Sequence, residues 1–255
     1  MIYHTAKQGS PEWLASRRGC ITGSRFKDCR DYKELTKAQI LEGRRRGDPS
    51  QKLLNYAMDL ARERCGGTAP GVFANAAMRF GTEQEPLARM SYEITTGHMV
   101  EEVGFITTDD GLFGLSPDGL IGDKGALEVK TMVSSATLFA AMVDGDISDY
   151  IDQCNGYMWL LGIQWVDLVL WAPDLAEEGM AMKIIHITRD EDAIEALESD
   201  LMAFAKMVQG YEAKLRRQIA CTTVEPVTKL VSSIHTPIPR PSVRPVANLL
   251  ESITF

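Results

Sequence analysis

The chain has 255 residues, of which 45% are hydrophobic and 24% are charged, and its formal net charge is −8. This composition indicates an ordinary soluble globular protein that can bury one substantial core. The acidic balance argues against a protein that coats nucleic acid by bulk electrostatics, but it is compatible with a confined channel lined by a few basic residues.

No segment approaches the roughly 20 consecutive apolar residues that a bilayer span needs. The first residues also lack the basic and apolar regions of a leader peptide. We therefore expect a cytoplasmic protein without membrane contact. The five cysteines are scattered with no C-x-x-C pair, which argues against a disulfide framework and against a zinc knuckle.

The N-terminal portion, residues 1–98, is predicted to be mainly helical. Its predicted helices lie within residues 12–26, 51–64 and 75–95. The first of these segments suggests two short helices joined by a tight turn, with the second capped near Thr22 or Ser24. Three consecutive arginines, residues 44–46, fall in a predicted exposed turn, either solvated or in contact with DNA phosphates.

Residues 99–216 are predicted to form the sheet core. The predicted strands cover residues 103–107, 112–115, 119–121, 126–131, 166–171 and 182–187. The predicted helices cover residues 134–143, 148–161 and about 191–216. The last helix presents a buried stripe of Ile194, Leu197, Leu201, Phe204, Ala205 and Val208.

This order of elements implies an α/β fold with a central mixed sheet flanked by helices. We expect one domain over residues 1–216. Residues 217–255 change in character to Thr, Val, Ser and Pro. They are predicted to form a Pro-rich tail or arm.

The strongest chemical signal is Ser116-Pro117-Asp118-Gly119 followed by Glu128-Val129-Lys130. Strand alternation places Glu128 and Lys130 on one face of an otherwise apolar strand. Asp118 and Glu128 offer hard oxygen ligands for Mg²⁺, and Lys130 can orient a water molecule and stabilise negative charge. Such a set suits hydrolysis of a phosphodiester. The competing interpretation is an exposed hairpin with solvated charges.

This interpretation makes a demand on the hairpin register. A two-residue turn at Asp123 and Lys124 would place Asp118 opposite Val129, on the wrong face. The chemistry requires an odd-length loop or a bulge, with Gly122 or Gly125 available for the left-handed conformation.

Four motifs in order resemble the lambda-exonuclease-like (YqaJ-type) viral recombination exonucleases of the PD-(D/E)xK nuclease superfamily. They are Gly81-Thr82-Glu83-Gln84-Glu85, Ser116 to Gly119, Glu128 to Lys130, and Gln153 on a helix. The resemblance covers roughly residues 12–213. It implies a restriction-endonuclease-like core.

The resemblance also implies a set of site roles. Asp118, Glu128 and the Val129 carbonyl match metal ligands, and Lys130 matches the catalytic lysine. The remaining matches are Glu85 as the helix-borne acid, Asp109 or its neighbour Asp110 as a further acid, and Gln153. The implied cofactor is Mg²⁺, replaceable by Mn²⁺, with two ions.

Two of these residues have structural competitors. Thr82-x-x-Glu85 also reads as a capping box, although Pro86 at the fourth helical position weakens that interpretation. Gln153 reads equally well as a polar residue on an exposed helix face.

The resemblance further assigns a terminal 5′-phosphate to Arg17, Thr22, Ser24 and Ser116. An arginine fork and hydroxyls beside a helix N-terminus form a reasonable anion site. Arg18 competes with Arg17 for this role. Relatives place another arginine six positions after the catalytic lysine, where this sequence has Ala136, so Ser134, Ser135 or Thr137 is left to contribute.

We therefore expect a 5′→3′ exonuclease that acts on 5′-phosphorylated double-stranded DNA ends and leaves 3′ overhangs for phage-type recombination. The resemblance implies a ring of three subunits and a single-strand annealing partner in a bacterial host. The alternatives are a PD-(D/E)xK endonuclease or RecB-like nuclease, and a catalytically inert DNA-end-binding module. The iron–sulfur branch is disfavoured because clustered cysteines are missing.

Overall fold

The computed structural model describes residues 1–68 and 76–220, and residues 1–219 form one compact unit. The expected tail lies outside the described residues from position 221 onwards. Its first four positions, 217–220, belong instead to the last helix, α8 (Glu191–Ala220). Within the described ranges, no helix is long and apolar enough to cross a membrane.

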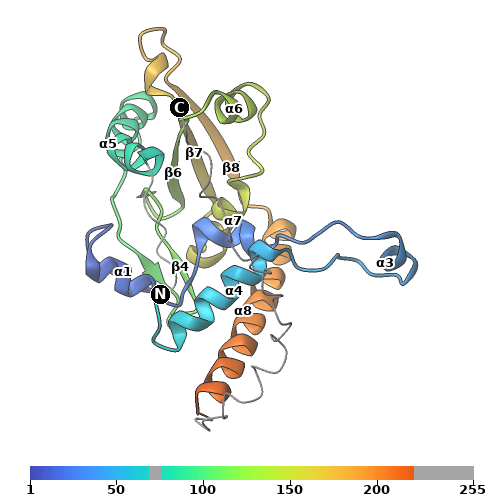
Figure 1. Cartoon of the computed structure of the whole chain (residues 1–255). Helices are drawn as coiled ribbons and strands as arrows, with labels where there is room; N and C mark the ends of the chain where they lie inside the picture. The colour runs from blue at the N-terminus through green and yellow to red at the C-terminus, as the bar shows by residue number, and fades with distance from the viewer. Residues whose placement is uncertain (69–75, 221–255) are drawn as a thin grey trace, which may run out of the picture. The chain divides into compact units, whose positions relative to one another are not determined.

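The β structure of the described residues consists of two four-stranded sheets, each with parallel and antiparallel pairs (Figure 1). The first has the order β1 (Ile2–Tyr3), β3 (Ile106–Thr107), β4 (Phe113–Leu115), β2 (Ile21–Thr22). The second has the order β5 (Gly119–Ile121), β6 (Gly125–Thr131), β7 (Trp165–Trp171), β8 (Met182–Thr188). All six predicted strands are present, whereas the two-residue strands β1 and β2 were not predicted because they carry too little periodicity.

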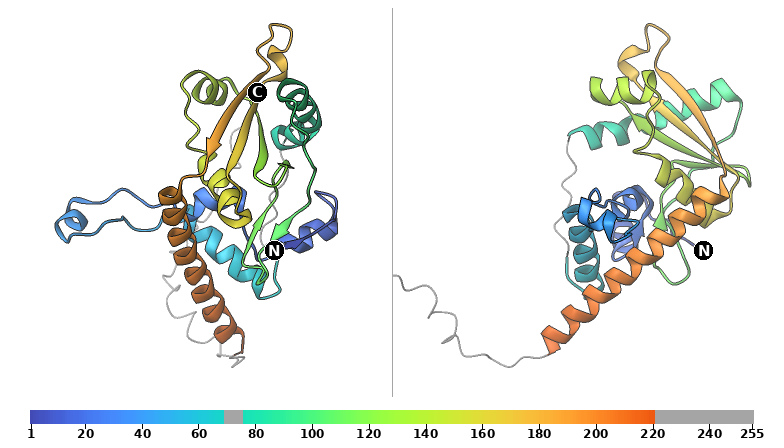
Figure 2. Two further views of the ribbon diagram at one scale, coloured as in Figure 1. Left: turned by 180° about the vertical axis from the view of Figure 1, so that it is seen from behind. Right: turned by 90° about the vertical axis from the view of Figure 1, so that its right-hand side faces the viewer.

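The helix α8 begins just after β8 and runs beyond the second sheet, beside residues 51–64, where the Tyr56 ring stacks on Phe204 (Figure 1). The second sheet is the middle layer between α5 (Ala76–Thr96) on one face and α7 (Ile151–Leu161) on the other (Figures 1 and 2). Alternation along β7 explains both contacts. Val166, Leu168 and Leu170 belong to the large core, while Val169 and Trp171 pack in a smaller core with residues of α5.

The helical predictions are largely confirmed. The helix α4 (Gln51–Arg64) has the predicted bounds, and the six residues of the predicted α8 stripe are all buried. The shorter helical elements are α1 (Pro11–Arg17), η1 (Gly23–Arg25), α2 (Phe26–Cys29), α3 (Lys37–Leu41), α6 (Ser135–Leu138), η2 (Phe139–Val143) and η3 (Pro173–Leu175).

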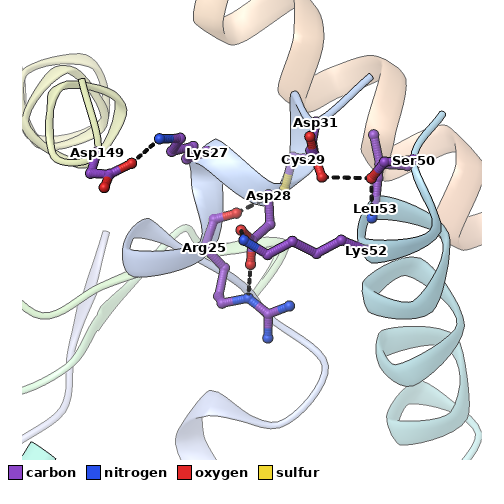
Figure 3. Close-up of polar contacts among 9 residues, drawn as sticks. All are labelled: Arg25, Lys27, Asp28, Cys29, Asp31, Ser50, Lys52, Leu53 and Asp149. Carbon is purple, nitrogen blue, oxygen red and sulfur yellow. Dashed lines mark hydrogen bonds and ion pairs between the residues drawn. The ribbon is translucent and has the colours of Figure 1, made fainter. Parts of the chain in front are cut away.

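The segment after α1 differs from its prediction. Instead of a helix capped near Thr22 or Ser24, Thr22 ends β2 and leads into the three-residue turn η1 without a side-chain cap. Polar contacts fix the following helix α2, since Asp28 binds Arg25 and Lys52, and Lys27 binds Asp149 ahead of α7 (Figure 3). Because β2 lies in a sheet and α2 is held by these contacts, the segment between them is fixed at both ends.

Polar contacts also attach α5 to the sheet. The Trp171 indole donates a hydrogen bond to Gln84 at 3.1 Å, and the Tyr92 hydroxyl donates one to the buried Asp167 at 2.5 Å. These bonds and the burial of Ala88 hold the helix against β7. They determine where the side chains of its first half lie.

Candidate active site

The β5–β6 hairpin places Asp118 and Glu128 on the same side of the sheet. Gly119 pairs with Leu127 and Ile121 with Gly125, so Asp118 lies opposite Glu128 in register. The connecting loop therefore has three residues, and Gly122 has a φ of 54°, in the left-handed region that glycine adopts without strain. The predicted odd-length loop is confirmed.

The backbone of β6 orients Asp118. The Asp118 amide donates to the Leu127 carbonyl at 3.1 Å, and the Val129 amide donates to Asp118 Oδ2 at 2.6 Å. The other carboxylate oxygen is not used by either bond, so Asp118 keeps a free acceptor beside Glu128.

Glu128 is the centre of the polar cluster and is only 3% exposed. Its Oε1 lies 2.6 Å from Lys130 Nζ and accepts a hydrogen bond from Gln153 Nε2 at 2.8 Å. Its Oε2 accepts one from the Tyr157 hydroxyl at 2.5 Å. Gln153 therefore lies inside the cluster, which contradicts the alternative of a polar residue on an exposed face.

Lys130 is held by two acceptors. Its Nζ contacts Glu128 and also donates to Gln153 Oε1 at 3.1 Å. Burial lowers the pKa of Lys130, but the adjacent Glu128 outweighs this effect, so the pKa is raised above its ordinary value. The lysine therefore stays charged and fixed in position.

Glu85 reaches the cluster from α5 on the opposite side. Burial, together with repulsion from Glu128, raises the pKa of Glu85 to about 7. The same two causes raise the pKa of Asp118 well above its ordinary value. Glu85, Asp118 and Glu128 therefore lie close together. The positive charge around them is too small for all three carboxylates to be ionised.

The capping-box alternative for Glu85 is wrong. The helix α5 spans Ala76–Thr96 and runs through Thr82 and Pro86, so neither Thr82 nor Glu85 lies at its N-terminus. The Thr82 hydroxyl donates to the Met78 carbonyl one turn back, at 3.3 Å. The Glu85 carboxylate therefore does not cap the helix, and it lines the same cavity as Asp118 and Glu128.

One cavity contains both the carboxylate–lysine cluster and the predicted phosphate-binding residues. It has a volume of about 200 Å³, and its walls include Arg17, Thr22, Ser24 and Ser116 together with the carboxylates, Lys130 and Gln153. The Arg17 guanidinium lies over the Trp13 ring, 4.2 Å from its centroid. The structure thus joins a carboxylate–lysine cluster and an arginine–hydroxyl cluster in one space.

Arg17 has no carboxylate partner among the described residues. Burial lowers its pKa, and none of the carboxylates in the described part of the chain contributes to that shift. Arg18 is exposed and does not line the cavity, so the structure favours Arg17 of the two. The helix N-terminus expected beside these residues is only the short turn η1.

Asp109 is not part of the cluster, and its prediction as a metal ligand is corrected. It lies in the β3–β4 turn, at the opposite end of that hairpin from Asp118. Its side chain is 82% exposed and binds the Met1 ammonium at 2.7 Å. Asp110 does not replace it, because that carboxylate accepts hydrogen bonds from Thr108 and Leu112 within the same turn.

The residues around Ala136 do not line the cavity either. Ser134 caps α6 by accepting a hydrogen bond from the Thr137 amide at 3.2 Å, and the two hydroxyls are 2.8 Å apart. Their polar groups are therefore used within the helix, and they do not replace the missing arginine.

Three cavity or cluster residues escaped the sequence analysis, namely Tyr157, Trp13 and Gln8. Tyr157 follows Gln153 by four residues on α7, and Trp13 precedes Arg17 by four on α1. Helical spacing places such pairs on one face, so it was the available signal. Gln8 lies ahead of α1 and offered no pattern.

Comparison with known proteins places the chain in a family. Residues 12–164 match the model of the YqaJ-like viral recombinase domain. The alkaline exonuclease LHK-Exo from Laribacter hongkongensis is 34% identical over 84% of this chain and 100% of its own, with a TM-score of 0.69.

The chain belongs to the YqaJ-like viral recombinase domain family. The complex of LHK-Exo with dAMP gives a TM-score of 0.70 at the same identity and coverage. A phage related exonuclease from Haemophilus somnus 129PT is 16% identical over 78% of this chain and 96% of its own, with a TM-score of 0.57, and supports the fold alone. No curated protein matches the chain.

Membership of the YqaJ family makes this chain a nuclease with a restriction-endonuclease-like fold, as expected. Every predicted site residue, from Arg17 to Gln153, falls within the matched segment. The helix α8 lies beyond it, although α8 supplies much of the large core.

YqaJ-type nucleases generally need a divalent metal ion, and the donor set fits one. The described residues hold no group of three acidic, histidine or cysteine side chains already spaced around one ion position. However, burial and the repulsion between neighbouring carboxylates raise the pKa of Glu85 and of Asp118, and a bound cation would offset that repulsion. Carboxylate and carbonyl oxygens are also the donors that Mg²⁺ prefers.

Proposed function

We propose that this protein is a Mg²⁺-dependent 5′→3′ exonuclease. It digests one strand of linear double-stranded DNA and leaves 3′ single-stranded overhangs for phage-type recombination. The observation that carries the proposal is that one cavity is lined both by Glu85, Asp118, Glu128 and Lys130 and by Arg17. Residues 1–216 act as one nuclease domain.

Asp118, Glu128, Glu85 and the Val129 carbonyl hold the metal, which we take to be two Mg²⁺ ions or Mn²⁺ in their place. Bound divalent ions polarise the phosphate and favour deprotonation of water. Gln153 and Tyr157 keep Glu128 in place.

Lys130 orients the attacking water and stabilises the negative charge that develops on the phosphate. Its Nζ is already fixed between Glu128 and Gln153, so little reorganisation is needed.

Arg17, with Thr22, Ser24 and Ser116, binds the terminal 5′-phosphate. An arginine without a carboxylate partner among the described residues retains its hydrogen bonds for an incoming phosphate. Anchoring that phosphate in the same cavity as the carboxylates selects the bond nearest a 5′ end.

The test uses linear duplex labelled at the 5′ or the 3′ end, with and without Mg²⁺ and with a 5′-phosphate or a 5′-hydroxyl. We expect Mg²⁺-dependent release from 5′-phosphorylated ends, and its loss in Lys130→Ala. Arg17→Ala should lower the preference for 5′-phosphate about tenfold or more. Arg18→Ala is the matched control and should keep the preference.

Release from 3′ ends, or activity that survives Lys130→Ala, contradicts the proposal. Cleavage of closed circular DNA would indicate an endonuclease. Binding of DNA ends without hydrolysis under all metal conditions would indicate an inert end-binding module.

We further infer a homotrimeric ring, a single-strand annealing protein as partner, and action in the cytoplasm of a bacterial host from a phage or prophage gene. The family description, a viral recombinase domain, supports the setting. Exposed apolar residues on one side of α5 support self-association, namely Leu87 (49%), Met90 (57%) and Ile94 (79%).

A further inference from the structure

Arg89 contacts the backbone of the predicted metal ligand Asp118. It lies one turn after Glu85 on α5, so the two side chains share a helix face. Its Nη1 donates to the Asp118 carbonyl at 3.1 Å, and its Nη2 donates to Glu102. The side chain is only 15% exposed.

Asp118 is therefore held at three points. Its amide and its carboxylate are bonded to the backbone of β6, through Leu127 and Val129. Its carbonyl is bonded to Arg89 of α5. The first two bonds orient Asp118 relative to Glu128, and the third is the direct hydrogen bond between Asp118 and the helix that carries Glu85.

The two halves of the Arg89 contact are unequal. The Glu102 side chain is 72% exposed, so its ion pair with Arg89 is solvated and contributes little. The bond to the Asp118 carbonyl is charge-assisted and partly buried, and such bonds are stronger and more directional.

We propose that Arg89 is a positioning residue that sets the distance between Glu85 and Asp118, and through it the affinity of the site for divalent metal. The inference rests on the proposed metal site. Arg89 does not touch the substrate in this role; it keeps two ligands from different elements in register. Replacing a residue that orients a metal ligand typically lowers metal affinity or activity by roughly 10–100-fold.

The test compares Arg89→Met, Arg89→Lys and Glu102→Gln with the unaltered full-length protein. Calorimetric titration with MnCl₂ in the absence of DNA measures metal affinity directly. A nuclease assay then gives the Mg²⁺ concentration for half-maximal rate and the KM for DNA. Circular dichroism and thermal melting check that each variant is folded.

We expect Arg89→Met to weaken Mn²⁺ binding about tenfold or more, with the KM for DNA nearly unchanged and the rate restored by excess Mg²⁺. Arg89→Lys keeps a charged donor group without the planar fork, so its Mn²⁺ affinity should lie between those of the unaltered protein and Arg89→Met. It also serves if Arg89→Met does not fold. Glu102→Gln should match the unaltered protein.

Unchanged Mn²⁺ affinity in both Arg89 variants overturns the inference. So does an equal loss in Glu102→Gln, which would assign the effect to the exposed ion pair. Absence of Mn²⁺ binding in the unaltered protein is a separate result, because it contradicts the proposed metal-dependent function itself.

Discussion

Single side chains of the site differ in how tightly they are held. Both carboxylate oxygens of Glu128 accept hydrogen bonds from neighbouring side chains, whereas the Asp118 carboxylate accepts one from a backbone amide. The pKa of Glu85 is set by burial and by the charge of its neighbours. Replacing one partner therefore has a different consequence for each acid.

Tyr157→Phe should lower nuclease activity about tenfold. The change removes the donor to Glu128 Oε2 and the acceptor for Gln153 Nε2 while preserving the ring. A buried acceptor without a partner costs about 1–3 kcal/mol, so the free energy of unfolding should also fall. Single-turnover kinetics and urea denaturation measure the two effects.

The control for that variant is Tyr150→Phe. The Tyr150 ring lies 5.7 Å from Lys130 Nζ, and the variant retains that ring. Equal losses of activity in the two variants would show that the Tyr157 hydroxyl has no specific role.

Glu85 should make metal-free stability depend on pH. Its folded pKa of about 7 exceeds the ordinary value of 4.5, so between these pH values the folded state keeps a proton that the unfolded chain has lost. The stability contributed by Glu85 is complete below pH 4.5 and decreases as pH rises towards about 7. Melting temperatures in EDTA, compared between the unaltered protein and Glu85→Gln, measure this.

The expected result is a Glu85→Gln protein that gains relative stability as pH rises, with the difference levelling off above pH 7. Added Mg²⁺ at pH 8 should stabilise the unaltered protein more than the variant. A difference in melting temperature that is independent of pH would mean that Glu85 titrates normally.

Among the elements, α7 depends on a close approach to α2. A Cβ at Gly156 would collide with the Phe26 ring, so only glycine lets the helix pack at this distance. Gly156 lies between Gln153 and Tyr157, and α2 follows the β2–η1 segment that lines the cavity. The packing of these two helices therefore positions Gln153 and Tyr157 relative to the β2–η1 segment.

Gly156→Ala should lower the free energy of unfolding by about 1–3 kcal/mol and reduce activity as α7 shifts. The matched control is Gly210→Ala on α8, where a Cβ meets no atom within 4 Å. That variant should be more stable by about 0.5–1 kcal/mol, because alanine favours a helix interior. Urea denaturation of both proteins checks the opposite signs; equal effects would contradict the packing argument.

For the whole molecule, the exposed side of α5 is the feature that predicts assembly. Ile94 is 79% exposed on the helix that carries Glu85. Self-association through this surface would therefore involve the helix that carries Glu85.

Ile94→Glu should shift the proposed trimer towards monomer in sedimentation velocity, since a buried unpaired charge destabilises an apolar interface. Met180→Glu, at a 54% exposed position in the β7–β8 connection, is the control. An unchanged trimer in Ile94→Glu would place the interface elsewhere.

Local sequence pattern predicted the elements of regular periodicity. The bounds of α4 and the buried stripe of α8 followed from it, because helix and strand periods are local properties. The odd-length loop that aligns Asp118 with Glu128 followed instead from the requirement that two metal-binding carboxylates share a face of the sheet. The family resemblance added Glu85, Gln153 and Arg17.

Which residues from distant segments meet depends on how the elements pack in the folded chain. The tertiary structure brought Glu85, Arg17 and Tyr157 to Glu128 and excluded Asp109, which adjoined the motif in sequence but lies at the far end of its hairpin. It also revealed Arg89 on Asp118. Contacts between elements depend on how the layers pack, and sequence spacing carries no information about that packing.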